Sequence, residues 1–416
     1  MNIDSFKRVC VVGWGRSGIA LANLLLALGK KVRVSEQKER NSFAQGQIDS
    51  FAKQGVEFEF GSHSENFIKT CDLAVVSPGV DTFNSQAFKL IQALEIPAIG
   101  EIEFSFWLTK ADCVAITGTN GKTTTTHLTY EVLRSKRKRV FLGGNIGTPF
   151  ASFVLQTKKN DLVVLELSSF QLETIIKFRP RVAALLNITP DHLDRYKDFA
   201  GYLGAKMNIF RNQTADDYAV LNKDAGFNVE KFAPVRSKIL YFSDEFPNEN
   251  LSCVYRIARI YGLSKTDCQA VFSKFRGLPH RMQLVRNING ITFVNDSKAT
   301  NPSSTVWALK NTKGPVILLA GGKDKGLDYS EIVPYIKRVK KINVFGQAAQ
   351  LISDSLKGHI PIENFPSFKG AIEASLGQAN TGDTVILSPM CSSYDMFKNY
   401  EERGDKFIEI VNNLKT

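Results

Sequence analysis

The chain has 416 residues, of which 43% are hydrophobic and 23% are charged. This composition is ordinary for folded proteins and excludes a disordered, collagenous or low-complexity chain. At about 150 residues per domain, the length predicts roughly three domains. The formal net charge of +12 favours an anionic partner, which could be nucleic acid, a membrane surface or a phosphorylated small molecule.

The chain shows no feature of a membrane-inserted or secreted protein. No run approaches the ~20 apolar residues that cross a bilayer, and the N-terminal residues lack a secretory signal. The six cysteines are scattered and form no C-x-x-C pair. We therefore expect buried, reduced thiols and a cytoplasmic location.

Short, continuous apolar runs recur along the chain and predict strands that are buried on both faces. These runs lie at 9–13, 73–77, 113–117, 162–168, 182–189, 316–322, 342–346 and 384–389. Helical patterns lie between many of them, among others at 17–30, 123–136 and 334–341. Strands that alternate with helices are typical of α/β domains with parallel sheets.

Two interruptions divide this pattern. Pro and Gly break it at 96–104, and Gly277 and Pro279 break it again at 275–282. We therefore predict three units, which span residues 1–99, 100–277 and 278–416.

The first motif is a glycine-rich turn after the first predicted strand. Gly13, Gly15 and Gly18 form G-x-G-x-x-G, which lets a diphosphate approach a helix N-terminus. Glu36 ends the next strand, where a carboxylate can accept a ribose hydroxyl. The motif fits an NAD-dependent dehydrogenase, a pocket for another nucleotide diphosphate, or glycines needed only for packing.

The second motif, at 113–126, is a strand, a loop and a helix that resemble a phosphate-binding loop. Gly118, Gly121, Lys122 and Thr123 supply its core, although Ile116 stands where the general pattern has its first glycine. Backbone N–H groups would hold phosphates, the lysine would reach the β and γ oxygens, and the threonine could ligate Mg²⁺. The segment predicts binding of a nucleoside triphosphate.

Polar residues stand at the ends of the next strands. Glu166 lies in an apolar strand, where it would form a salt bridge or hold Mg²⁺. Asp191, His192 and Asp194 follow the next strand, and we expect a functional role for the histidine. Lys206 resembles an ordinary surface lysine by its sequence context.

Two further polar segments remain. Asn145 lies in the turn 143–149 and could face a ligand. The segment 294–304 contains Asp296, Lys298 and Thr300, and its polar residues could serve a ligand or cap the helix that follows.

Taken together, these motifs resemble the ATP-dependent Mur ligases of peptidoglycan synthesis. The blocks that carry the resemblance are TGTNGKTTT (117–125), GGNIGTP (143–149), ELSSFQLE (166–173), NITPDHLDRY (187–196), GLPHR (277–281), NDSKATNP (295–302) and LSPMCSSYDMFKNYEERGDKF (387–407). The last block resembles the tail of the branch that adds D-glutamate. Folate polyglutamylating ligases share the phosphate loop but lack this tail, and they remain an alternative.

The resemblance implies an α/β fold with a Rossmann-like N-terminal domain, a central P-loop ATPase-like domain and a C-terminal Rossmann-like domain. It implies an ATP-dependent, ADP-forming ligase that joins D-glutamate to UDP-N-acetylmuramoyl-L-alanine through an acyl phosphate. The N-terminal glycine turn would then bind UDP, the central domain ATP and the C-terminal domain D-glutamate. The enzyme would be a cytoplasmic monomer with small-molecule partners and no nucleic acid.

The resemblance also implies roles for individual residues. The nucleotide would contact Gly118, Thr119, Asn120, Gly121, Lys122, Thr123, Thr124, Asn250, Arg281, Asp296 and Lys298. The other substrates would contact Arg16, Ser17, Glu36, Gln37, Ser77, Asn145, Thr300, Lys325, Ser393 and Tyr400. Two Mg²⁺ ions would be held by Thr123 and Glu166 and by His192 and a carbamylated Lys206. The catalytic residues would be Lys122, Asn145, His192 and Lys206.

Some positions differ from the family pattern. The family often has Asp at Glu36 and Phe at Tyr400, and Phe246-Pro247 replaces a His-Asn pair near the expected adenine contacts. The basic runs 134–139 and 337–341 raise a third hypothesis, a nucleic-acid-binding ATPase. We interpret both runs as solvated helix ends, because no nucleic-acid-binding fold is recognisable.

Overall fold

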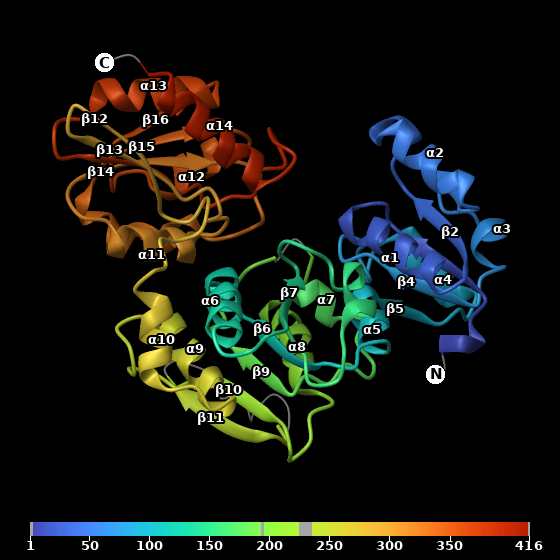
Figure 1. Ribbon diagram of the computed structural model, residues 1–416. Helices are drawn as coiled ribbons and strands as arrows, with labels where there is room; N and C mark the ends of the chain where they lie inside the picture. The colour runs from blue at the N-terminus through green and yellow to red at the C-terminus, as the bar shows by residue number, and fades with distance from the viewer. Residues whose placement is uncertain (1–2, 193–194, 224–234, 415–416) are drawn as a thin grey trace. The chain divides into compact units, whose positions relative to one another are not determined.

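The computed structural model describes residues 3–192, 195–223 and 235–414 (Figure 1). The chain divides into two compact units, one formed by residues 1–188 and 200–274 and the other by residues 189–199 and 275–416. Three sheets with flanking helices make up these units, two in the first unit and one in the second. The predicted fold class, α/β with three domains, is confirmed.

The first sheet has the order β3-β2-β1-β4-β5, and all its strands are parallel. Its strands are β1 (Arg8–Val12), β2 (Lys31–Glu36), β3 (Glu57–Phe60), β4 (Leu73–Val76) and β5 (Ala98–Gly100). Its helices are α1 (Arg16–Ala27), α2 (Gln45–Lys53), α3 (Glu65–Ile68) and α4 (Gln86–Ala93). The strand order reverses between β1 and β4, and open α/β sheets bind ligands beyond the carboxyl ends of strands at such a point.

The second sheet has the order β11-β10-β9-β6-β8-β7 and is also parallel. Its strands are β6 (Asp112–Thr117), β7 (Val140–Gly144), β8 (Leu162–Glu166), β9 (Val182–Leu185), β10 (Tyr218–Asn222) and β11 (Lys238–Phe242). The helices of this region are α5 (Glu101–Phe106), α6 (Lys122–Arg134), α7 (Ser169–Leu172), α8 (Phe199–Met207), α9 (Glu249–Ile260) and α10 (Lys265–Phe272). Because β6 lies between β8 and β9, the loops after these three strands come together.

The third sheet is mixed, with the order β12-β13-β17-β14-β15-β16. Its strands are β12 (Gln283–Ile288), β13 (Ile291–Asn295), β14 (Val316–Gly321), β15 (Val339–Phe345), β16 (Ile362–Phe365) and β17 (Thr384–Leu387). The helices are α11 (Pro302–Asn311), α12 (Ala349–Ser355), α13 (Phe368–Gln378) and α14 (Tyr400–Asn412). Only β12 runs antiparallel, in a hairpin with β13.

The predicted strands are present. Each continuous apolar run forms a buried strand in the middle of a sheet. The helix predicted at 334–341 is only partly confirmed, because residues 334–338 are helical and residues 339–341 belong to a strand. A 3₁₀ helix, η7 (Tyr329–Arg338), contains Pro334, and β15 begins directly after it. Proline lacks the N–H that an α-helix needs, and Val339, Ile342 and Val344 fit a buried strand.

Two other expectations concern the cysteines and the membrane. All six cysteines are buried, free thiols, as predicted. Among the residues that the structure describes, no helix is both long and apolar enough to cross a bilayer.

Candidate functional site

The glycine-rich turn after β1 depends on close backbone contacts. Gly13 has a φ of +95°, and a Cβ on Gly18 would lie 2.0 Å from the Gly13 carbonyl oxygen. The Ser77 hydroxyl donates to the same oxygen at 3.1 Å. These contacts bring the start of α1 against the ends of β1 and β4, at the switch point of the sheet.

Glu36 is fixed beneath this turn. Its carboxylate accepts the backbone N–H of Trp14 at 2.6 Å and that of Lys38 at 2.9 Å. The side chain is 9% exposed. Arg16 and Ser17 begin α1, and Gln37 follows β2 as an exposed residue. The five substrate-binding residues predicted for this domain therefore lie around the carboxyl ends of β1, β2 and β4.

The loop between β6 and α6 adopts the open backbone that a phosphate loop needs. Gly118 and Gly121 have φ angles of +155° and +79°. Asn187, which the sequence analysis did not single out, accepts the N–H of Asn120 at 2.9 Å through its side chain, and its backbone carbonyl accepts the N–H of Thr119 at 3.1 Å. The position of Asn187 after β9 was the signal that could have identified it.

Two lysine side chains converge on this loop. Lys122 Nζ donates to the carbonyl oxygens of Gly118 and Thr119 at 2.9 and 2.8 Å. Lys206 Nζ donates to the same Gly118 oxygen at 2.8 Å and lies over the Tyr202 ring. Lys206 is 1% exposed, so its interpretation as a surface lysine from sequence context is wrong. A buried lysine beside a phosphate loop is a candidate for chemistry.

The neighbouring strand end supplies a carboxylate. Glu166 is 1% exposed and ends β8, paired in register with Ile116 of β6. The Asn145 side-chain amide donates to Glu166 Oε1 at 2.8 Å, and the Asn145 N–H donates to the Glu166 carbonyl at 2.8 Å. The predicted residues Asn145 and Glu166 are thus joined in one group.

Glu166 and Thr123 could together hold a Mg²⁺ ion. Among the described residues no cluster of three or more His, Cys, Asp or Glu side chains could hold a metal ion. Mg²⁺ needs no such cluster, because it commonly binds one or two protein oxygens together with water and substrate phosphates. Glu166 and the Thr123 hydroxyl at the start of α6 fit that pattern.

Asn250, which lies near the expected adenine contacts, also packs against the phosphate loop. A Cβ on Gly121 would lie 2.4 Å from Asn250 Oδ1, so the Asn250 side chain lies directly against the loop. Thr124 is half-buried in the first turn of α6. Phe246 is packed against Tyr255 and Phe272, so the phenylalanine that replaces the family's histidine contributes to local packing.

In the second unit, the segment after β9 is anchored by Asp191. Its Oδ1 lies 2.7 Å from Lys325 Nζ, and its Oδ2 accepts the Asn301 side chain at 3.1 Å. His192 has a φ of +56° and lies with its Nε2 3.7 Å from Asp191 Oδ2. The structure thus brings His192 together with Lys325, while Lys206 belongs to the first unit. Asp194 lies outside the described residues.

Asp296 lies at the end of β13 and is fully enclosed. Its carboxylate accepts the Met282 N–H at 3.2 Å and the Ser388 hydroxyl at 3.0 Å. Burial raises the pKa of Asp296 to about 7, although Arg281 opposes this shift. Lys298 Nζ lies 4.8 Å from the centre of the Tyr400 ring, and the Thr300 N–H donates to the Lys298 carbonyl.

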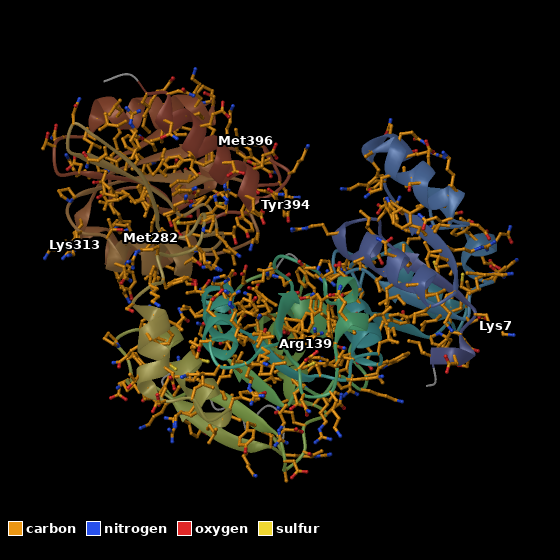
Figure 2. The ribbon with its side chains drawn as sticks, in the orientation of Figure 1. Lys7, Arg139, Met282, Lys313, Tyr394 and Met396 are labelled. Atoms are coloured by element: carbon orange, nitrogen blue, oxygen red, sulfur yellow. The ribbon has the colours of Figure 1, made fainter. Side chains whose placement is uncertain are left out.

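The loops after β14 and β17 lie side by side. A backbone bridge joins Lys323 to Ser392, which places Lys325 and Ser393 on adjacent loops, both nearly buried. In the same tail Tyr394 and Met396 are exposed by 69% and 41% (Figure 2).

The tail is held by Arg403, which sequence reasoning missed. This side chain is fully buried and donates to the Ser297 hydroxyl and to the carbonyls of Ser297, Cys391 and Ser392. Burial lowers its pKa to about 10. Arg403 therefore links the segment after β13 to the tail at the start of α14.

Three family models match the chain. They are the Mur ligase MurD-like N-terminal domain at residues 7–100, the Mur ligase middle domain at 116–279 and the Mur ligase glutamate ligase domain at 280–391. The chain is 36% identical to a UDP-N-acetylmuramoylalanine–D-glutamate ligase of Thermoanaerobacter pseudethanolicus, over 98% of this chain and 99% of the relative. It is 38% identical to the protein of the same name from Salinibacter ruber, over 98% of each chain.

A solved structure has a similar fold. The UDP-N-acetylmuramate-alanine ligase MurC of Thermotoga maritima matches with a TM-score of 0.62 and 18% identity, over 99% of this chain and 100% of that chain. At that identity the likeness concerns the fold alone.

Proposed function

This chain belongs to the Mur ligase family of ATP-dependent amide ligases, and we propose that it joins D-glutamate to UDP-N-acetylmuramoyl-L-alanine in peptidoglycan precursor synthesis. The observation that carries the proposal is full-length similarity, at 36–38% identity, to ligases named for D-glutamate. These relatives are named for a UDP-linked substrate, which favours UDP over NAD at the glycine turn.

The reaction would proceed through an acyl phosphate. The terminal phosphoryl group of ATP passes to the alanine carboxylate, which turns a poor electrophile into a reactive mixed anhydride. The amine of D-glutamate attacks its carbonyl carbon, loses a proton, and the tetrahedral intermediate expels inorganic phosphate. One amide bond forms, and ADP and phosphate are released.

The phosphate loop would bind the ATP phosphates. The N–H groups of residues 118–123 and the Lys122 ammonium offset negative charge on the transferring group. Mur ligases use ATP and Mg²⁺, and Mg²⁺ supplies further charge neutralisation when it is bound. Thr123 and Glu166 would hold one ion, and Asn145 would orient the Glu166 carboxylate.

A second ion would be held by His192 and a carbamylated Lys206. Support for the carbamate comes from the burial of Lys206 beside the phosphate loop, where an oxygen ligand suits Mg²⁺ better than an ammonium. Arg281, Asp296, Lys298 and Asn250 would complete the nucleotide site.

The other substrates would occupy the two remaining sites. Arg16, Ser17, Glu36, Gln37 and Ser77 would hold the uridine diphosphate at the switch point of the first sheet. Lys325, Ser393, Thr300 and Tyr400 would hold D-glutamate. We further propose domain boundaries at 1–99, 100–277 and 278–416, a monomer and a cytoplasmic location.

A two-substrate assay tests the proposal. We expect release of ADP and phosphate only when UDP-N-acetylmuramoyl-L-alanine and D-glutamate are both present, with L-glutamate inactive. Turnover with a folate and L-glutamate, or with L-glutamate in place of the D form, would refute the substrate assignment. Reduction of NAD by the same protein would instead support the hypothesis of an NAD-dependent dehydrogenase.

A further inference from the structure

A basic hollow lies at the amino-terminal edge of the third sheet, and we propose that it binds a phosphate group. Its volume is about 550 Å³, and its lining is Lys313, Gly314, Pro315, Lys337, Arg338, Val339 and Lys340. We call it the basic hollow. The substrate-binding and catalytic residues proposed for this unit follow the carboxyl ends of strands, so this site is separate from them.

The strand pairing brings the two basic segments together. Val316 at the start of β14 is paired with Val339 at the start of β15, so the residues just before each strand are neighbours. The Arg338 guanidinium donates to the Thr312 carbonyl at 3.3 Å, which fixes one segment against the other. The cationic residues therefore lie on neighbouring segments because of the fold and not only because the sequence is basic.

A bulge in β15 adds the fourth cation. The register passes from Val316–Val339 to Ile317–Lys341 and skips Lys340, so Lys340 is an extra residue on its strand. Lys340 Nζ lies 2.6 Å from Asp383 Oδ2, and this buried aspartate also accepts the Asn380 N–H. The pair holds the Lys340 ammonium at the rim of the basic hollow.

The charge of the basic hollow is poorly balanced. Among the described residues, no carboxylate lies within 4.0 Å of the cationic groups of Lys313, Lys337 or Arg338. All three side chains are exposed, and Lys313 lies at the edge of its unit (Figure 2). Cations gathered on one open part of the surface attract anions, and a doubly charged phosphate can contact more than one of them.

The rest of the lining limits the kind of ligand. Gly314, Pro315 and Val339 offer no aromatic face on which a nucleobase could stack and no side-chain amide that could read one. The basic hollow therefore suits the phosphate itself, either on a small free molecule or on the headgroup of an anionic lipid. It also gives a role to the basic run 337–341, which the proposed ligase activity leaves unexplained.

Site-resolved lysine acetylation of the full-length enzyme tests this proposal, with peptide mass spectrometry as the readout. One arm uses inorganic pyrophosphate, and the other uses phosphatidylcholine vesicles with or without phosphatidylglycerol. We expect acetylation of Lys313 and Lys337 to slow by about threefold at a ligand concentration of twice the Kd. Lys357 and Lys369, which are exposed in the same unit, should react unchanged.

Because the readout belongs to single lysines, pyrophosphate bound at the phosphate loop does not affect it. Protection by pyrophosphate identifies a free phosphate compound, and protection only by the anionic vesicles identifies a lipid headgroup. Equal slowing of all four lysines, or slowing of none, overturns the proposal.

Charge reversal provides the matched control. In the wild type, acetylation of Lys340, the third lysine of the lining, should slow together with that of Lys313 and Lys337. K313E/K337E should lose this protection of Lys340, whereas K357E/K369E, with the same change in net charge, should keep it. Both variants should retain ligase activity, since none of these residues lies in the proposed catalytic machinery. Equal loss of the protection in both variants would show that net charge alone attracts the anion, and this result also contradicts the proposal.

Discussion

Lys325 Nζ lies 2.7 Å from Asp191 Oδ1, and the two side chains are only 8% and 7% exposed. Burial acts to raise the pKa of Asp191, but the Lys325 ammonium and the other donors around it hold that pKa well below its usual range. The pair joins the segment after β9 to the loop after β14, within the second unit.

We expect Asp191→Asn and Lys325→Met each to destabilise the second unit by about 3 kcal/mol, since each leaves a buried partner without its counter-charge. The double variant should cost less than the sum of the two. Urea unfolding followed by tryptophan fluorescence measures this double-mutant cycle. Simple additivity would show that the pair is energetically independent.

The glycine turn offers a second test. Gly18→Ala places a Cβ 2.0 Å from the Gly13 carbonyl oxygen, whereas Gly15→Ala meets nothing within 4 Å. We expect Gly18→Ala to lower the unfolding free energy by about 2 kcal/mol, and Gly15→Ala to leave it nearly unchanged. Thermal unfolding of both variants measures the difference, and equal effects would argue against the close approach.

The phosphate loop allows a similar comparison. Gly121 and Gly147 have φ angles of +79° and +61°, but only a Cβ on Gly121 meets a neighbour, Asn250. Both alanine variants should carry backbone strain of about 1 kcal/mol, and Gly121→Ala should lose roughly 1–3 kcal/mol more through overpacking.

Adding Asn250→Ala to Gly121→Ala should recover the steric part of this loss and leave the strain. Calorimetric melting of the three variants and the wild type separates the two contributions. If Asn250→Ala restored nothing, the contact between the two residues would not be the cause.

Glu101 makes stability depend on pH. It lies in the first turn of α5, and burial raises its pKa from 4.5 to about 7, although the Ala151 N–H, which donates to Oε1 at 2.6 Å, opposes this shift. Between these two pH values the folded chain keeps a proton that the unfolded chain has lost. The unfolding free energy should therefore fall as pH rises from about 4.5 to about 7, by at most about 1.4 kcal/mol per pH unit, and level off above that range.

Glu101→Gln keeps the acceptor for Ala151 and removes the charge, so its unfolding free energy should fall less steeply over this range. Urea titrations at pH 5, 6, 7 and 8 measure the slopes. Glu65→Gln is the control, because Glu65 is 62% exposed and should leave the wild-type slope unchanged. A wild-type slope in Glu101→Gln would refute the role of Glu101.

The sequence predicted the elements whose signal is local. Continuous apolar runs marked the buried strands, and glycine spacing marked the two tight loops after β1 and β6. It could not predict the burial of Lys206, because the contact of Lys206 with Gly118 joins residues 88 positions apart. The same holds for Arg403, whose buried network depends on how the tail packs after β13.

The composition alone could not show what the basic residues of the run 134–139 contact. Lys136 forms an ion pair with Asp267, and Arg137 lies over the Tyr261 ring. Arg139, labelled in Figure 2, forms an ion pair with Asp161. These partners occupy much of the run and hold it against the rest of the first unit.

The second unit is discontinuous in sequence, since residues 189–199 belong to it although the first unit resumes at 200. A recombinant fragment that starts at 275 would therefore lack Asp191, which is the partner of the Lys325 ammonium. Cleavage of the peptide bond at 274–275 alone would not release the second unit, because the chain also passes between the units on either side of 189–199. Fragment studies of the second unit should therefore include residues 189–199, supplied in trans or fused to the fragment.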